Sequence, residues 1–135
     1  MAADRYDQFE TLTVDRPADG VLRITMGDGE RLPSVDAAMH YDLAHVWREI
    51  DADEEVSVAI LRGAGKGFSA GGDFDMVEKV TTEFDMRVRV WKEARDLVYN
   101  VINCSKPIVS AMHGPAVGAG LVAGLLADIS IVARD

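Results

Sequence analysis

Two alternating segments near the start of the chain predict a β-hairpin. In residues 9–16, Leu12 and Val14 alternate with threonines, and in residues 21–26 apolar residues again alternate with polar ones. A period of two is typical of a strand with one buried face. Between the segments, Pro17-Ala-Asp-Gly20 has residues that favour a chain reversal. We therefore expect the two strands to pair in antiparallel fashion.

Apolar residues at spacings of three and four predict two long helices. The first spans about 35–51, with Ser34 as its N-cap, and the second spans 84–102. A helix also opens at Phe74, and a short apolar helix spans 121–127. One stripe of the helix at 84–102 is apolar, and we expect it to pack in the core. Its members are Phe84, Val88, Trp91, Ala94, Val98 and Ile102.

Continuous apolar runs between these helices predict parallel strands. They lie at 56–61, 108–112 and 129–133, and the first two are expected to be covered on both faces. Strands that alternate with helices are typical of an α/β fold with right-handed crossovers. The sequence therefore predicts a single α/β domain.

Two glycine-rich loops carry the candidate chemistry. Gly63-Ala-Gly-Lys-Gly-Phe-Ser-Ala-Gly-Gly-Asp73 and His113-Gly-Pro-Ala-Val-Gly-Ala-Gly120 each follow a predicted strand and precede a helix. Glycine lets a ligand approach the backbone N–H groups closely, and a helix N-terminus adds positive potential. Loops at the carboxyl ends of neighbouring parallel strands open into one crevice. Two such loops can direct two N–H groups at one carbonyl oxygen, which is an oxyanion hole.

Three other glycine-containing motifs have sequence patterns close to that of the first loop. The dinucleotide fingerprint requires a third glycine where Phe68 stands, and the phosphate loop requires Ser or Thr after Gly65-Lys66. The serine-hydrolase elbow G-x-S-x-G matches around Ser69, although that serine lies eight residues past Leu61 rather than at a sharp strand-to-helix turn. A hydrolase using Ser69 and His113 therefore stays open, with an ordinary loop role for His113 as the simpler interpretation.

Composition narrows the class of protein. The formal net charge is −9, from 23 acidic and 14 basic residues, which argues against nucleic acid or an anionic membrane as partner. The single cysteine, Cys104, cannot form an internal disulfide and is expected to be a small buried hydrophobic residue. No apolar run reaches the roughly 18 residues of a membrane span. These features predict a cytoplasmic protein without a metal site.

Three segments resemble motifs of a known family. Ala59–Asp73 is similar to the first signature of the crotonase superfamily, the enoyl-CoA hydratase/isomerase family. Lys106–Gly120, followed by Ala127-Asp-Ile129, resembles the second, and Pro33–Met39 resembles the family's entry to its first helix. The resemblance covers the chain from about Phe9 to Asp135.

This resemblance implies a crotonase-like spiral of ββα units, truncated before its C-terminal half. It implies one domain over residues 1–135, in which we expect 1–8 to be flexible. It also implies an enzyme that acts on acyl-CoA thioesters, either a hydratase (a lyase) or an isomerase. CoA is then part of the substrate and no separate cofactor is needed. The full-length parent is expected to be a homotrimer or a dimer of trimers.

The resemblance assigns residues to both parts of a site. The backbone N–H groups of Gly72 and Ala119 correspond to the oxyanion hole. Residues expected to contact CoA are Arg31, Ser34, Lys66, Phe68, Ala70, Gly71, Asp73 and Gly118. Among them, Arg31 and Lys66 are candidates for the phosphates. Asp73 is also expected to cap the following helix.

The chain departs from the family at the residues that decide the reaction. Val122 stands where a hydratase has its first catalytic glutamate, and the place of the second lies beyond Asp135. Valine cannot transfer a proton, so the reaction within the family stays open. The alternative is a non-catalytic CoA-binding or assembly paralogue, or an inactive fragment. Truncation would also leave an exposed sheet edge.

Overall fold

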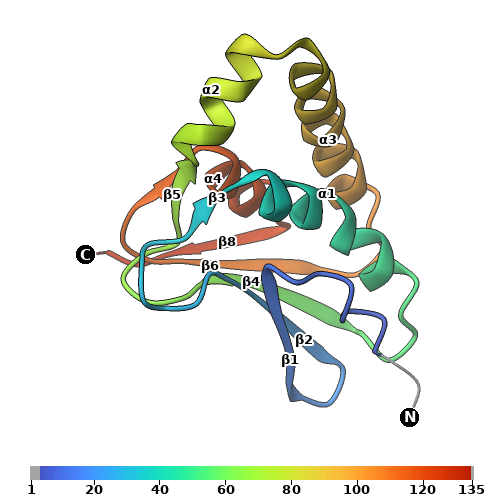
Figure 1. Ribbon diagram of the computed structural model, residues 1–135. Helices are drawn as coiled ribbons and strands as arrows, with labels where there is room; N and C mark the ends of the chain where they lie inside the picture. Colours follow the sequence, from blue (N-terminus) through green and yellow to red (C-terminus); the bar gives the residue numbers. More distant parts are fainter. Residues whose placement is uncertain (1–3, 135) are drawn as a thin grey trace.

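The computed structural model describes residues 4–134, which form two sheets and four helices (Figure 1). A five-stranded sheet has the order β1-β2-β4-β6-β8, and a three-stranded sheet has the order β3-β5-β7. The strands are β1 (Leu12–Ala18), β2 (Val21–Met26), β3 (Ser34–Val35), β4 (Val58–Gly63), β5 (Ser69–Gly72), β6 (Ile108–Met112), β7 (Ala116–Val117) and β8 (Ile129–Val132). The helices are α1 (Ala37–Asp51), α2 (Phe74–Thr82), α3 (Phe84–Ile102) and α4 (Gly118–Leu125).

The predicted hairpin and parallel sheet are both confirmed. β1 pairs with β2 in antiparallel fashion, with Thr13 opposite Thr25, and β2, β4, β6 and β8 then pair in parallel. β1 begins at Leu12, later than expected, because the preceding residues form turns in which the Leu12 N–H donates to the Phe9 carbonyl. The bounds expected for β2, β6 and α3 match those in the structure.

Helices cover only one face of the five-stranded sheet. Figure 1 shows α1, α3 and α4 on the same side of it. Buried residues of α1, including Leu43 and Trp47, pack on the inward face of the strands. On the outward face, Ile60 and Val109 are only half-buried, and Arg62 and Ile131 are exposed. The prediction that the runs at 56–61 and 108–112 are covered on both faces is therefore wrong, because no described helix packs on the outer side.

The first helix begins two residues later than the sequence suggested. Ser34 belongs to β3, where it pairs with Gly71, so it cannot be the N-cap. Asp36 takes that role, and its carboxylate accepts a hydrogen bond from the Met39 N–H at 2.8 Å. Both residue types are good caps, and strand pairing decides between them.

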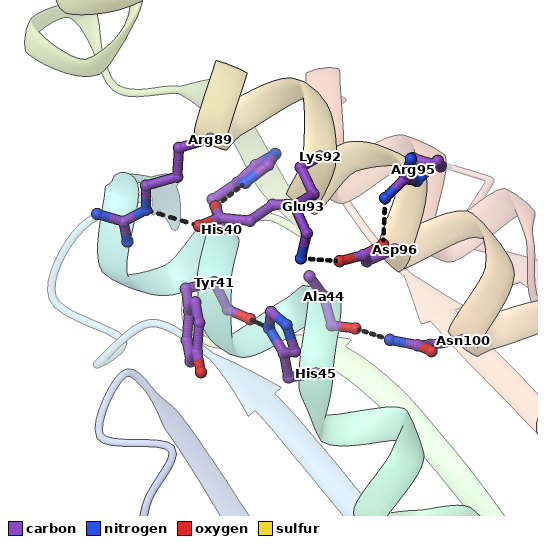
Figure 2. A network of polar contacts seen from close by, with 10 residues as sticks. All are labelled: His40, Tyr41, Ala44, His45, Arg89, Lys92, Glu93, Arg95, Asp96 and Asn100. Atoms are coloured by element: carbon purple, nitrogen blue, oxygen red, sulfur yellow. Dashed lines mark hydrogen bonds and ion pairs between the residues drawn. The ribbon is translucent and has the colours of Figure 1, made fainter. Parts of the chain in front are cut away.

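The apolar stripe expected to pack in the core is on the outer surface of α3. Trp91 and Phe84 are each 71% exposed, whereas Glu93, Leu97 and Val101 are buried. The inward face is fixed by polar contacts between α1 and α3 (Figure 2). Glu93 contacts His40 Nδ1 at 2.7 Å and accepts a hydrogen bond from Arg89 Nε at 2.7 Å. A buried glutamate thus occupies a position that periodicity alone would assign to solvent.

The start of the described chain is held by another buried carboxylate. The Tyr6 hydroxyl and an Arg16 guanidinium N–H each donate to Asp53 at 2.8 Å. Burial acts to raise the pKa of Asp53, but these hydrogen bonds outweigh it and the pKa is lowered. Of the residues 1–8 expected to be flexible, residues 1–3 lie outside the described part, and Tyr6 is buried in the core.

Two further sequence features have simple structural counterparts. Cys104 is partly buried against the core, and burial raises the pKa of its thiol. This favours the inert role expected for it. Within residues 4–134, every helix is too short or too polar to cross a membrane.

Candidate functional site

The two glycine loops meet at the three-stranded sheet. The central strand, β5, pairs with β3 on one side and with β7 on the other, both in parallel. The Ala70 N–H donates to the Pro33 carbonyl at 2.7 Å, and the Asp73 N–H donates to the Val35 carbonyl at 2.9 Å. Two neighbouring strands therefore fix the backbone around Gly72.

Two glycines bring the loops into direct backbone contact. Gly71 and Gly118 both have positive φ, at 89° and 62°. A Cβ atom on Gly118 would lie 2.9 Å from the Cα of Gly71 and 3.4 Å from the backbone nitrogen of Gly72. Only glycine permits this approach without strain. The start of α4 is therefore packed against the Gly71–Gly72 backbone.

The first turn of α4 has main-chain donors without a side-chain cap. Its N-cap is Val117, which makes no capping hydrogen bond from its side chain. Ala119 is the second residue of the helix, so its N–H has no partner within the helix. The positive end of the helix dipole lies here as well. Gly72 is exposed and Ala119 is partly buried. The arrangement can thus present main-chain donors from two adjacent segments.

Asp73 directs α2 away from this contact. Its Oδ1 accepts hydrogen bonds from the N–H groups of Asp75, at 3.0 Å, and Met76, at 3.3 Å. The predicted capping role is confirmed. Because the carboxylate is engaged in this way, α2 begins immediately after Gly72.

Ser69 connects the two loops and does not fit the role of a nucleophile. The residue is fully buried. Its Oγ accepts the Gly71 N–H at 3.1 Å and donates to the Val117 carbonyl at 3.1 Å. His113, the candidate base, instead contacts the Gly65 carbonyl through Nε2 at 2.8 Å. The geometry therefore argues against the serine-hydrolase alternative.

Three loops touch beside the site, and two of them carry the cationic candidates Arg31 and Lys66. A Cβ on Gly65 would lie 2.7 Å from the carbonyl oxygen of Gly29, so the loop holding Lys66 lies on the loop holding Arg31. The Phe68 N–H donates to the Pro115 carbonyl at 3.0 Å, which adds the third loop.

A hollow of about 310 Å³ gathers three of the residues expected to contact CoA. Arg31, Ser34 and Asp73 line it, together with Asp28 and Asp36. Hydrogen bonds from the backbone N–H groups of Glu30 and then Arg31 lower the pKa of Asp28. The hollow is thus acidic on balance, with Arg31 as the cation among its lining residues.

The other predicted contact residues have different surroundings. The Phe68 side chain is fully buried in the core, so only its backbone could face a ligand. Ala70 and Lys66 are exposed, while Gly71 is buried between strands. Gly118 forms the loop-to-loop contact described above.

Two apolar residues beside Gly72 were not predicted from the sequence to belong to the site. A Cβ on Gly72 would lie 3.4 Å from the side chains of Met76 and Val77. Both belong to the first turns of α2, so a group bound at the Gly72 amide would have apolar neighbours. Their positions, four and five residues after Gly72, could have predicted this closeness. A helix that begins just after Gly72 returns to the same side after about one turn.

Comparison with known proteins agrees with this architecture. Residues 16–135 match the family described as enoyl-CoA hydratase/isomerase. The 1,2-epoxyphenylacetyl-CoA isomerase of Escherichia coli is 34% identical over 118 residues, which are 86% of this chain. A probable enoyl-CoA hydratase 1, peroxisomal, from Arabidopsis thaliana is 32% identical over 123 residues, or 91% of this chain.

A solved structure shows the same fold. The crystal structure of an enoyl-CoA hydratase/isomerase from Mycobacterium paratuberculosis superposes with a TM-score of 0.87 at 33% identity. The match covers 94% of this chain and 51% of that one. Likewise, the match covers 45% of the Escherichia coli protein and 44% of the Arabidopsis protein. The chain spans about half the length of these relatives, and it belongs to the enoyl-CoA hydratase/isomerase family, the crotonase family.

Proposed function

We propose that this chain forms the oxyanion-hole half of an enzyme that acts on acyl-CoA thioesters. The main-chain N–H groups of Gly72 and Ala119 donate hydrogen bonds to the thioester carbonyl oxygen. When a base such as solvent hydroxide takes a proton from the α-carbon, the negative charge moves onto that oxygen as an enolate. Each well-placed donor of this kind is worth roughly 3–4 kcal/mol in the transition state.

One observation carries the proposal: the close contact between Gly118 and the Gly71–Gly72 backbone. It joins the uncapped first turn of α4 to the end of β5. Each segment supplies one donor, and the helix dipole supports charge on the shared acceptor. Family membership supports the same assignment, since several relatives carry names of enzymes that act on CoA esters.

The CoA moiety is assigned to the neighbouring loops. Arg31 and Lys66 stand on loops in contact with each other, where they can pair with phosphate oxygens. Ser34, Ala70, Gly71 and Gly118 border the path from these cations to Gly72, through the β3–β5–β7 pairing. The acyl group then lies against Met76 and Val77.

Hydratases and isomerases share the enolate but differ in the side chain that transfers protons to and from the substrate. Val122 is 45% exposed and occupies the position where hydratases of the family have a glutamate. Asp73, the carboxylate next to Gly72, is engaged in capping α2. The proposal therefore names the stabilisation of an enolate, shared by hydratases and isomerases, as the function of this part of the protein.

Exchange of α-protons tests enolate formation directly. The protein is incubated with butanoyl-CoA in D₂O, and loss of the α-proton signal is followed by NMR, alongside loss of enoyl absorbance with crotonyl-CoA. We expect exchange above the rate without protein. If neither exchange nor turnover occurs for any chain length of thioester, catalysis by this chain is refuted.

A second function is favoured by Val122. A CoA-binding or assembly paralogue needs the same loops but no proton-transferring side chain at this position. Calorimetric titration with CoA separates the two functions. Binding of CoA without exchange or turnover supports the paralogue, and absence of both binding and exchange removes both proposals.

A further inference from the structure

The open face of the five-stranded sheet contains a hollow that is lined in part by the first residues of the two glycine-rich loops, Gly63–Gly65 and His113. Three neighbouring strands place Arg62, Ala111 and Ile131 side by side in register. Adjacent strands are about 5 Å apart, so these three side chains form one row across the sheet. The small Ala111 leaves space between its larger neighbours. The resulting hollow has a volume of about 510 Å³.

This hollow lies where the parallel strands end. Its rim is formed by the segments that follow β4, β6 and β8. In Figure 1 these ends lie together near the C-terminus, on the side that the helices do not cover. The carboxyl ends of parallel strands are the usual location of ligand sites in α/β sheets. A volume of this size is typical of small-molecule pockets.

Two polar side chains of the hollow are already held in place. The Arg62 Nε donates to Thr25 Oγ1 at 2.9 Å, and the rest of its guanidinium has no hydrogen-bond partner among residues 4–134. His113 Nε2 lies 2.8 Å from the Gly65 carbonyl, which can only accept, so Nε2 carries the proton and Nδ1 remains available. Anchoring lowers the entropy cost of using these groups to bind a ligand.

The charge and polarity of the residues that line the hollow indicate which class of ligand it could bind. None of the described residues that line the hollow is acidic, although the chain has 23 acidic residues and a net charge of −9. On the open face the lining is apolar at Ala111 and Ile131. A guanidinium beside an apolar surface suits a carboxylate that carries a hydrocarbon body, because the fork of N–H groups matches the two oxygens.

We propose that this hollow is a binding site for a monocarboxylate with an apolar body. The carboxylate pairs with Arg62, and the hydrocarbon covers Ala111 and Ile131. His113 stands at the rim of the hollow. The site is separate from the proposed oxyanion hole, so the inference does not rest on the proposed function.

Titration with four small probes tests the two halves of this proposal. Hexanoate, acetate, hexanol and inorganic phosphate are each added to the protein, and binding is measured by ligand-observed NMR and by chemical-shift changes at Ile131 and His113. We expect hexanoate to bind and to shift both residues, and the other three to bind at least about 10-fold more weakly. If acetate or phosphate binds as tightly as hexanoate, the proposed apolar contact is refuted. If hexanol binds as tightly as hexanoate, the proposed role of Arg62 is refuted.

Substitutions locate the site. Arg62→Gln removes the charge-assisted hydrogen bonds and should weaken hexanoate binding by about 10- to 100-fold. Ala111→Leu fills the hollow and should abolish binding, and because the residue lies on the open face, the sheet should remain folded by circular dichroism.

Arg23 provides a matched control on the same face of the sheet. Its guanidinium is engaged with Asp15 through Nε at 2.9 Å, and it does not line the hollow. Arg23→Gln should leave hexanoate binding unchanged. Retention of binding in both Arg62→Gln and Ala111→Leu, or equal loss in Arg23→Gln, would overturn the proposal.

Discussion

The Cα of Gly71 lies 2.9 Å from the point that a Cβ on Gly118 would occupy. These residues are far apart in sequence, and both adopt positive φ. Their contact places the start of one helix against the end of one strand without any side chain between them. The relation between the two proposed donors, Gly72 and Ala119, therefore depends on two glycines that are not themselves the proposed donors to the substrate.

Substitution of Gly118 by alanine should separate the two loops. The added methyl group collides with Gly71, and alanine also strains a backbone with φ of 62°. We expect a loss of about 100-fold or more in α-proton exchange, comparable to removal of one oxyanion donor. The measurement is the exchange rate with butanoyl-CoA.

Gly29→Ala is the control for this substitution. Gly29 also has positive φ, at 87°, but a Cβ there would meet nothing closer than 3.8 Å. It should show the cost of backbone strain, about 1 kcal/mol of stability, while exchange is preserved. Equal exchange in the wild type and in Gly118→Ala would contradict the proposed oxyanion hole.

Loss of the buried carboxylate between α1 and α3 should strongly destabilise the fold. Glu93→Ala leaves His40 Nδ1 and Arg89 Nε without their partner, and both His40 and Glu93 are buried. Breaking a buried pair in this way costs about 3–5 kcal/mol. Urea unfolding followed by circular dichroism gives the free energy of unfolding.

A neighbouring ion pair on the same helix gives the comparison. Asp96 pairs with Lys92 at 3.1 Å, and the lysine side chain is 64% exposed (Figure 2). Asp96→Ala should cost no more than about 1 kcal/mol. If Glu93→Ala and Asp96→Ala lower the free energy of unfolding by similar amounts, the burial of Glu93 does not determine how much it stabilises the fold.

Tyr6 should make stability fall at alkaline pH. Burial, and then its hydrogen bond to Asp53, raise the pKa of Tyr6 above its ordinary value of about 10. The folded state therefore retains this proton when the unfolded state loses it, so the contribution is complete below pH of about 10 and declines as the pH rises further. Urea unfolding at neutral pH and at pH of about 10.5 measures the decline.

Two phenylalanine substitutions isolate this effect. Tyr6→Phe should lower stability by about 1 kcal/mol at neutral pH, through the lost hydrogen bond, and should flatten the alkaline decline. Tyr99→Phe changes a residue that is 56% exposed and should alter neither. If the free energy of unfolding falls as steeply with pH in Tyr6→Phe as in the wild type, other groups cause the decline.

Removal of one acidic charge should improve CoA binding. Asp28 lines the same hollow as Arg31, and its lowered pKa keeps it ionised at neutral pH. Its charge repels phosphate, so Asp28→Asn should tighten CoA binding by about 2- to 5-fold at low salt, with a smaller gain at high salt. Calorimetric titration at two salt concentrations provides the test, with Asp19→Asn as a control outside this hollow. If Asp28→Asn binds CoA more weakly, the CoA phosphates do not bind beside Arg31 in this hollow.

Local patterns predicted most of the fold, because the relevant interactions are close in sequence. The turn residues Pro17–Gly20 were sufficient for the hairpin, and helical periodicity gave the bounds of α3. The face that α3 buries was not predictable in this way. Trp91 lies outward because Glu93 finds His40 on another helix, and a contact between distant segments has no signature in the helix's own sequence.

The candidate site was predictable in part for the same reason. Glycine density indicated where backbone would be accessible, and Asp73 was recognised as a cap from its position before a helix. The sequence did not indicate that Ser69 is the link between the loops, since a serine between glycines also fits a nucleophile. The burial of Ser69 and its hydrogen bonds to both loops separate these interpretations.

The backbone contact at Gly118 also determines how this site would respond to mutational scanning. Alanine replacement removes side chains, so it would leave the proposed donors intact: Ala119 is already alanine, and a methyl group added to Gly72 would meet nothing closer than 3.4 Å. The sensitive positions would be Gly71 and Gly118, whose close backbone contact holds the two donor segments together. A scan for catalytic residues would thus identify the glycines that position the site and overlook the amides that perform its chemistry.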